Sequence, residues 1–183
     1  MIILKPFYFI RHGQTDWNAK GRIMGHQDIP LNETGRNQAL QAKIHIEKLP
    51  ITHIYYSPLS RAAQTAHIIS EHMQCVKMPL PALKEQHFGE WEGAVLSPEV
   101  RDSFNREFPT NSDYVEKTIY NGINHILQNS ELPLIVAHGG TYWALRQLLT
   151  LPEHDIHNCQ LLYLEPPYEE KNSWTVTIIE KNL

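Results

Sequence analysis

Two short apolar runs in this chain each end at a histidine that is followed by glycine. The first run, residues 7–10, leads through Arg11 into His12, and the second, residues 134–137, leads into His138. A continuous apolar run that stops at polar residues is typical of a buried parallel strand that ends in a loop. Ligands of open α/β sheets bind just outside the carboxyl ends of such strands. We therefore expect one pocket around both histidines, built from distant parts of the chain.

The rest of the chain alternates between extended and helical patterns. Residues 32–49 place apolar side chains on one helical face, with Asn32 or Thr34 as the cap and Pro50 at the end. Alternating strands and helices are typical of layered α/β folds. We predict a three-layer α/β/α sandwich with a mostly parallel central sheet. The expected strands are 2–10, 53–57, 76–83, 134–137, 161–164 and 174–179, and the expected helices are 32–49, 60–73, 97–108, 113–128 and 141–149.

Length and composition narrow the class of protein. A chain of 183 residues with 42% hydrophobic and 20% charged residues predicts a single globular domain over residues 1–183. The net charge of -4 argues against nucleic-acid or membrane-surface binding. No apolar run approaches the roughly 20 residues that cross a bilayer. Cys75 and Cys159 form no disulfide framework, so we expect a reducing, cytoplasmic location.

The residue types near the two histidines suit phosphoryl chemistry. A neutral imidazole such as His12 is a competent nucleophile toward phosphorus. Arg11 and Arg61 are permanent cations with planar forks that match phosphate oxygens, and a protonated His138 would add charge. Glu85, on a loop after an extended segment, has the chemistry to protonate a leaving alkoxide and later activate water. No metal or other cofactor is required if these side chains supply the positive charge.

Each of these residues also has an ordinary structural interpretation. A strand-end histidine such as His12 often only makes hydrogen bonds, and an isolated Arg61 or Glu85 would be a solvated surface residue. The hypothesis depends on the two His-Gly strand ends occurring together with Arg11. A metal-dependent hydrolase is an alternative, because His154 and His157 would share a helical face, although no paired acids stand nearby at ligand spacing.

The order of the motifs resembles that of the histidine phosphatase superfamily, which has the phosphoglycerate mutase-like fold. The resemblance covers nearly the whole chain, and several motifs in the same order are far more specific than any one of them. The matching segments are residues 11–18 (RHGQTDWN), 21–25, 28–35, 57–66 (SPLSRAAQTA), 85–93 (EQHFGEWEG) and 136–140 (VAHGG).

The resemblance implies roles for individual residues. It implies a nucleophile that forms a phosphohistidine, a proton donor, a set of phosphate contacts and no metal. On this sequence the nucleophile would be His12, the proton donor Glu85, the main phosphate contacts Arg11, Arg61 and His138, and the secondary contacts Asn18 and the backbone of Gly139.

Two departures favour a phosphatase over a mutase. Mutases of this family resemble Glu-Arg-His-Tyr-Gly at the acid loop, whereas this chain has Gln86 and Phe88 in place of the arginine and tyrosine. Mutases also carry a longer, arginine-bearing insertion before the last motif; here only residues 94–133 intervene, with Arg101 and Arg106 as candidates. The Trp-Glu-Gly ending of the acid loop resembles the phosphatase branch, which includes alpha-ribazole-phosphate phosphatases.

We therefore predict a phosphomonoester hydrolase that acts on a small organic phosphate. A phosphoglycerate-type mutase and a catalytically weak phospho-ligand binding module remain as alternatives. Residues 109–113, Asn121 and Met24 depart from the family pattern on the substrate side, and the sequence does not indicate whether Arg22 reaches the pocket. Aromatic residues suggest a rim for a planar or apolar group: Trp17, His87, Trp91, Tyr142 and Trp143.

Overall fold

Six strands form one sheet in the computed structural model, which describes residues 1–100, 113–168 and 172–179. Their order across the sheet is β3-β2-β4-β1-β5-β6. The first four strands in that order run parallel, while β5 pairs antiparallel with β1 and β6 antiparallel with β5. The strands are β1 (Phe7–Arg11), β2 (His53–Tyr56), β3 (Val76–Pro79), β4 (Leu134–Ala137), β5 (Leu161–Glu165) and β6 (Thr175–Ile178).

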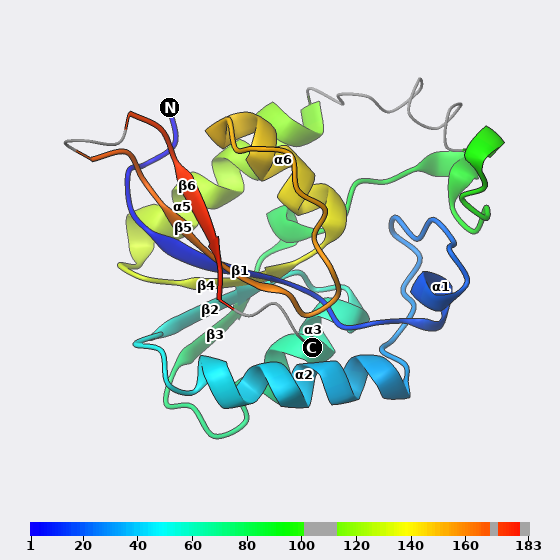
Figure 1. Ribbon diagram of the computed structural model, residues 1–183, viewed down its shortest axis with the longest axis horizontal. Helices are drawn as coiled ribbons and strands as arrows, with labels where there is room; N and C mark the ends of the chain where they lie inside the picture. The colour runs from blue at the N-terminus through cyan, green and yellow to red at the C-terminus, as the bar shows by residue number, and fades with distance from the viewer. Residues whose placement is uncertain (101–112, 169–171, 180–183) are drawn as a thin grey trace.

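Helices cover both faces of this sheet (Figure 1). One face packs against α2 (Glu33–Ile46) and α3 (Ser60–Ile69), and the other packs against α5 (Tyr120–Asn129) and α6 (Gly139–Leu149). The shorter helical segments are α1 (Asp16–Ala19), the 3-10 turns η1 (Pro81–Leu83) and η2 (Gly89–Trp91), and the π-helix η3 (Asp113–Ile119). None of the helices among the described residues has the length and apolar character needed to span a bilayer.

The pleat of β1 explains why both faces need a cover. Phe7 and Phe9 point into the core beneath α5 and α6, whereas Tyr8 and Ile10 point into the core beneath α2 and α3. Successive side chains on a strand alternate between faces, so an unbroken apolar run requires packing on both sides. The predicted three-layer α/β/α sandwich with a mostly parallel sheet is confirmed.

Several boundaries differ from the predictions. β1 begins at Phe7 rather than at residue 2, because Pro6 breaks the run and the backbone of Ile3 instead donates to Asn124 Oδ1 at 2.8 Å. The helix predicted over 113–128 is divided into η3 and α5. The boundaries of α2 aside, two of its apolar side chains face solvent rather than the sheet: Leu40 is 46% exposed and Ile44 is 49% exposed.

Two further predictions fall partly outside the described residues. The helix predicted over 97–108 extends into residues 101–112, and those residues include Arg101, Arg106 and most of the 109–113 segment. The hairpin predicted near Pro166 is confirmed by the antiparallel pairing of β5 with β6, although residues 169–171 are not described.

The neighbouring positions of β1 and β4 determine where the site lies. Arg11 pairs with Ala137 in the parallel register, so the next residues, His12 and His138, leave adjacent strands at the same edge. The amide of His12 also donates to the carbonyl of Ala137 at 2.9 Å. The carboxyl ends of the two central strands therefore meet where the sequence predicts a pocket.

Candidate active site

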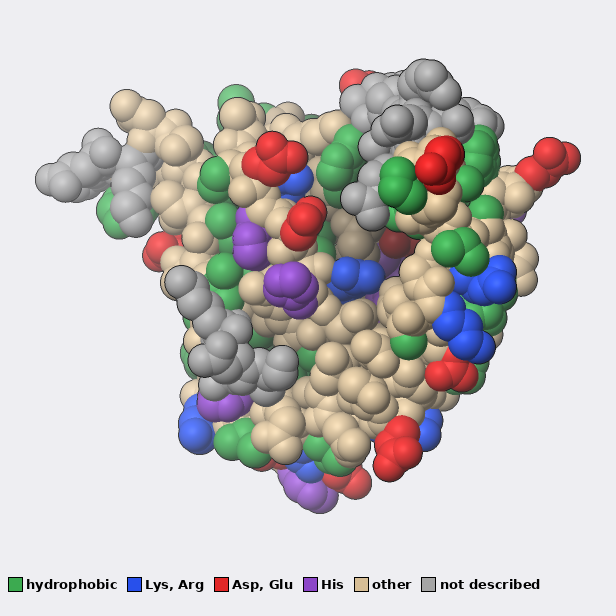
Figure 2. Space-filling view, turned by 45° about the vertical axis from the view of Figure 1, so that its right-hand side comes forward, with side chains coloured by type: hydrophobic (Ala, Val, Ile, Leu, Met, Phe, Trp, Pro, Cys, Tyr) green, Lys and Arg blue, Asp and Glu red, His purple; other side chains and the backbone are tan. Residues whose placement is uncertain are grey.

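The two strand-end histidines lie side by side. The centroids of the His12 and His138 rings are 5.2 Å apart, and the ring planes meet at 61°. Both side chains are buried, with exposed fractions of 1% and 0%. Figure 2 shows a hollow on one face of the molecule, where Lys or Arg side chains and His side chains lie close to an acidic side chain in its depth.

Hydrogen bonding fixes which nitrogen of His12 carries the proton. Its Nδ1 lies 2.7 Å from the carbonyl oxygen of Gly13, and a carbonyl only accepts, so Nδ1 donates. Burial lowers the pKa of His12 well below its ordinary value, and the positive charges of Arg61 and Arg11 lower it further. The ring is therefore neutral near pH 7, with its lone pair on Nε2.

His138 is held by a different partner. Its Nε2 lies 2.7 Å from the hydroxyl oxygen of Ser57, which follows β2, while its Nδ1 is buried without a partner. Burial lowers the pKa of His138 well below its ordinary value, with smaller contributions from Arg61 and His12. Without an anion nearby this imidazole is neutral, and the charge of a bound phosphate would favour its protonation.

Arg61 reaches the site from the first turn of α3. Its side chain is fully buried, and two of its nitrogens hold the loop that follows β1: Nη1 donates to Gln27 O at 2.9 Å and Nη2 to Gly25 O at 2.8 Å. Gly25 has a φ of +53°, which favours glycine at this turn. Arg61 therefore fixes the loop and keeps its third nitrogen, Nε, without a partner.

Arg11 lies at the end of β1 and is anchored on the opposite side. Its Nη1 donates to the carbonyl of Ile156 at 2.7 Å, and its Nε is buried without a partner. Arg11 Nε, Arg61 Nε and His138 Nδ1 are thus three buried nitrogens with no hydrogen bond to the described part of the chain. Because buried polar atoms are nearly always paired in proteins, three such atoms in a cationic setting fit a binding site for an anion.

Glu85 approaches from the loop that follows η1. Its Oε2 accepts from the amide of Gly140 at 3.1 Å, in the first turn of α6, where the helix dipole favours negative charge. A Cβ at Gly140 would collide with Glu85 Oε1, so glycine permits this approach. Burial lowers the pKa values of Arg11 and Arg61, and the negative charge of Glu85 partly raises them again. The carboxylate and both cations therefore belong to one cluster.

The secondary phosphate contacts expected from the resemblance lie beside this cluster. Thr15 caps α1 in a capping box that Asn18 completes. Asn158 Nδ2 lies 2.9 Å from the carbonyl oxygen of His12 and 3.4 Å from Asn18 Oδ1, so it links Asn18 to the nucleophile. Gly139 starts α6, and a Cβ built on it would lie 3.8 Å from Arg11 Nε. The structure therefore brings all seven predicted site residues to one region.

Glu92 was missed by the sequence reasoning. Its side chain is only 4% exposed, and Oε1 accepts from the amides of His26 at 2.8 Å and Phe88 at 3.1 Å. Oε2 accepts from Gln27 Nε2 at 3.1 Å. Burial would raise the pKa of Glu92, but these donors outweigh it and lower the value. Glu92 thus joins the loop after β1 to the acid loop. The sequence had marked it only as part of the Trp-Glu-Gly ending and as one of three acids within ten residues, without a role.

Other candidates lie elsewhere. Arg22 donates to the carbonyl of Gly93 at 2.6 Å and is exposed, so it braces a loop rather than joining the buried cations. Tyr142 is 1% exposed and packs in the core, which rules it out as part of an aromatic rim. Among residues 1–100, 113–168 and 172–179, no three His, Cys, Asp or Glu side chains form a metal-binding group, and His154 instead lies 3.3 Å from Gln160 Oε1.

Comparison with known proteins identifies the family. The model of the histidine phosphatase superfamily (branch 1) matches residues 7–175. The chain is 31% identical over 158 residues to an uncharacterized phosphatase, PhoE, of Bacillus subtilis strain 168, covering 84% of this chain and 81% of the relative. It is also 31% identical over 175 residues to a probable phosphoglycerate mutase, GpmB, of Cronobacter sakazakii, with the same coverage.

Solved structures agree on the fold. A putative alpha-ribazole-5'-P phosphatase from Escherichia coli superposes with a TM-score of 0.78 over 97% of both chains, at 20% identity. At that identity the likeness shows the fold alone. The family model matches residues 7–175, and the Bacillus subtilis relative is 31% identical over more than four fifths of both chains. These two matches show the family as well as the fold: the chain belongs to the histidine phosphatase superfamily.

Proposed function

We propose that this protein is a metal-independent phosphomonoester hydrolase that transfers the phosphoryl group of a small organic phosphate to His12. One observation carries the proposal: a neutral imidazole with its lone pair on Nε2 lies among the Arg11 and Arg61 cations, with the Glu85 carboxyl group in the same cluster. Phosphoryl transfer depends mainly on positioning and on charge neutralisation, and this cluster supplies both.

In the first step, His12 Nε2 attacks phosphorus and the bond from phosphorus to the ester oxygen breaks. Arg11 and Arg61 neutralise the charge on the phosphoryl oxygens, and His138 donates through Nδ1 once the phosphate charge has favoured its protonation. Glu85 takes up a proton when the negatively charged phosphate binds beside it, and it gives that proton to the departing oxygen, which leaves as an alcohol. The products are a phosphohistidine and a Glu85 carboxylate.

In the second step, water replaces the alcohol. The Glu85 carboxylate takes a proton from the water molecule while the water oxygen attacks phosphorus. The bond between phosphorus and Nε2 of His12 breaks, which returns the neutral imidazole and releases inorganic phosphate. Glu85 ends the cycle protonated, as it began. Asn18 and the amide of Gly139 act as secondary contacts to the phosphoryl group.

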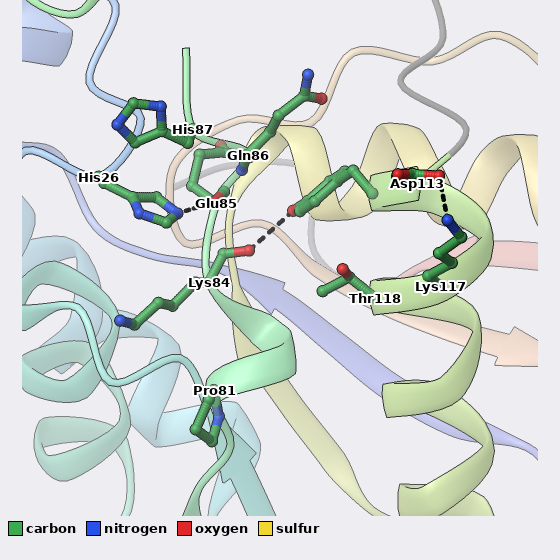
Figure 3. Close-up of a pocket in the computed structure, with 10 residues that line it drawn as sticks. His26, Pro81, Lys84, Glu85, Gln86, His87, Asp113, Lys117 and Thr118 are labelled. Carbon is green, nitrogen blue, oxygen red and sulfur yellow. Dashed lines mark hydrogen bonds and ion pairs between the residues drawn. The ribbon is translucent and has the colours of Figure 1, made fainter. Parts of the chain in front are cut away.

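A cavity beside Glu85 offers room for the organic part of the substrate. It has a volume of about 470 Å³ and lies between the acid loop and η3 (Figure 3). His26, Gln86 and His87 are among its lining residues, and Lys117 at its edge pairs with Asp113 at 2.8 Å. The Nε2 of Gln86 is buried and has no partner among the described residues, so a substrate hydroxyl or carbonyl would find a donor there.

Turnover of an aryl phosphate in the presence of a chelator tests the proposal. We expect the wild type to release phosphate and His12→Ala to lose at least about 10⁴-fold in kcat, since no other group replaces the nucleophile. Acid-quenched enzyme should carry phosphate on His12 in the wild type only. Activity that survives His12→Ala, or that disappears on chelation, would contradict the mechanism.

A phosphoglycerate-type mutase is the second candidate, because GpmB of Cronobacter sakazakii matches most of this chain. A mutase must hold the intermediate and exclude water, and it returns the phosphoryl group to a second position on the substrate. Priming with a bisphosphoglycerate and following exchange between 2- and 3-phosphoglycerate distinguishes the two. Exchange that is faster than phosphate release would favour the mutase.

A binding module without turnover is the remaining alternative. It would bind phosphate esters tightly and leave them intact, and it would not need a proton donor such as Glu85. In a hydrolase, Glu85→Gln should reduce kcat with a poor leaving group by about 10²–10⁴-fold, which is the range for a positioned general acid. The dissociation constant for an unreactive phosphate analogue should change far less.

A further inference from the structure

Tyr114 lies next to the acid loop although it comes from a distant helix. It is the second residue of η3, its side chain is 8% exposed, and its ring packs in the core beneath α5 and α6. Its hydroxyl donates to the carbonyl of Lys84 at 2.9 Å; Figure 3 marks this bond at the Lys84 carbonyl. The same oxygen lies 3.2 Å from the hydroxyl of Thr141.

The Lys84 carbonyl and the Thr141 hydroxyl both adjoin the groups that hold Glu85. Lys84 precedes Glu85 in the chain, so its carbonyl belongs to the peptide group that joins the two residues. Thr141 follows Gly140, whose amide donates to the Glu85 carboxylate at 3.1 Å. One oxygen of Tyr114 therefore connects the backbone before Glu85 to the helical turn that receives its carboxylate.

The hydroxyl remains a donor near neutral pH. Burial raises the pKa of Tyr114 well above its ordinary value, and the negative charge of Glu85 raises it further. A buried hydroxyl adds a desolvation cost that its hydrogen bonds must offset. The presence of tyrosine rather than phenylalanine is thus explained by its contacts around Glu85.

We infer that Tyr114 is a positioning residue for the proton donor: its hydroxyl, bonded to Lys84 O and facing Thr141, fixes where the Glu85 carboxyl group meets the leaving oxygen. The inference rests on the proposed hydrolysis, in which Glu85 protonates that oxygen. Tyr114 touches neither the phosphoryl group nor the nucleophile in this role. Its removal should therefore affect only substrates whose leaving group needs a proton.

The test compares two substrates in wild type and Tyr114→Phe. Ethyl phosphate has a strongly basic leaving group that needs the proton, whereas p-nitrophenyl phosphate leaves as a stable anion. The quantity measured is kcat/KM, because it reports the step that forms the phosphohistidine and not its later hydrolysis. For Tyr114→Phe we expect a loss of about 10-fold with ethyl phosphate and less than about 2-fold with p-nitrophenyl phosphate.

Two further variants separate positioning from general damage. Tyr142→Phe removes another buried tyrosine hydroxyl from the same core, and that hydroxyl has no hydrogen-bond partner, so both substrates should react as with wild type. In a Glu85→Gln background, Tyr114→Phe should have no additional effect on ethyl phosphate, because the proton that it positions is absent. Circular dichroism and thermal unfolding check that each variant is folded.

Thr141→Val provides an independent approach if Tyr114→Phe does not fold. It removes the second partner of the Tyr114 hydroxyl and should produce the same preference for the aryl substrate, with a loss of about 3-fold on ethyl phosphate. An equal loss with both substrates, or none with either, would overturn the inference while leaving the hydrolase intact. If Glu85→Gln itself shows no dependence on the leaving group, the assignment of Glu85 fails, and the inference fails with it.

Discussion

The two sides of the candidate site are built in different ways. The phosphate cradle, which we define as Arg11, His12, Arg61 and His138, comes from the ends of β1 and β4 and the first turn of α3. The acid side, which we define as residues 84–92 with His26 and Tyr114, consists of loops, 3-10 turns and the start of η3. In the cradle, Arg11, His12 and His138 are fixed by the register of β1 against β4, and Arg61 is fixed by its place on α3. The acid side is fixed by hydrogen bonds between loops.

This difference indicates which part of the site can vary. Moving Arg11, His12 or His138 would require a change in the register of β1 against β4, and a one-residue shift reverses the direction of every side chain on the strand. Moving the acid side requires only a change in a few bonds, such as those accepted by Glu92 from His26 and Phe88. We expect substitutions in the cradle to abolish chemistry. On the acid side, we expect substitutions of the buried residues that hold these bonds to alter rate and substrate choice.

Arg61→Ala should have the largest effect. It removes a phosphate-binding cation and leaves the carbonyls of Gly25 and Gln27 without their donor. We expect kcat/KM to fall by at least about 10³-fold and the free energy of unfolding to fall by about 3 kcal/mol, in line with the loss of one partner of a buried charged hydrogen bond. Steady-state kinetics and urea denaturation measure the two losses.

Arg36→Ala is the matched control for that experiment. Arg36 is exposed on α2 and donates to Leu31 O at 2.7 Å, and it belongs neither to the cradle nor to the acid side. Its loss should cost about 1 kcal/mol of stability and leave kcat/KM nearly unchanged. If both variants lost activity in proportion to stability, the proposed role of Arg61 in the cradle would be wrong.

The cradle histidines should make folding stability depend on pH. Their pKa values are lowered in the folded state from 6.5, so the unfolded chain binds more protons and stability falls as pH decreases below about 6.5. The loss between about pH 6.5 and 5.5 is about 1 kcal/mol for each histidine. Urea denaturation across this window should show that slope, and His138→Gln should remove about half of it; an unchanged slope would contradict the assignment.

Glu92→Gln tests the acid side at a point away from the reacting atoms. Glutamine keeps one acceptor oxygen but loses the second and the charge, so the links to His26, Gln27 and Phe88 are weakened. We expect kcat/KM with an alkyl phosphate to fall by about 10-fold, because a small displacement of Glu85 is costly, while stability falls by about 1–2 kcal/mol. The neighbouring exposed Glu90→Gln is the control and should change neither quantity.

Sequence reasoning was more successful for the cradle than for the acid side. Apolar runs that end in His-Gly indicated both strand ends, because burial and strand direction leave a local pattern. The contacts of Glu92 and Tyr114 have no such pattern, since they depend on how loops distant in the sequence pack together. On α2, by contrast, helical spacing places Ala39, Ala42 and Ile46 on one face, and these side chains are buried against the sheet, while Leu40 and Ile44 beside that face are exposed.

Arg22→Ala should produce the smallest effect and defines the outer limit of the acid side. Arg22 Nη1 donates to Gly93 O at 2.6 Å, next to the loop that Glu92 anchors, but the pair is exposed. Exposed charged hydrogen bonds contribute little, so we expect stability to fall by about 0.5 kcal/mol and kcat/KM to change by less than about 3-fold. Lys20→Ala is a suitable control because Lys20 is also exposed and ends α1. A loss in the Arg22 variant as large as that in Glu92→Gln would mean that Arg22 binds substrate, and the acid side would then extend to the surface of the first loop.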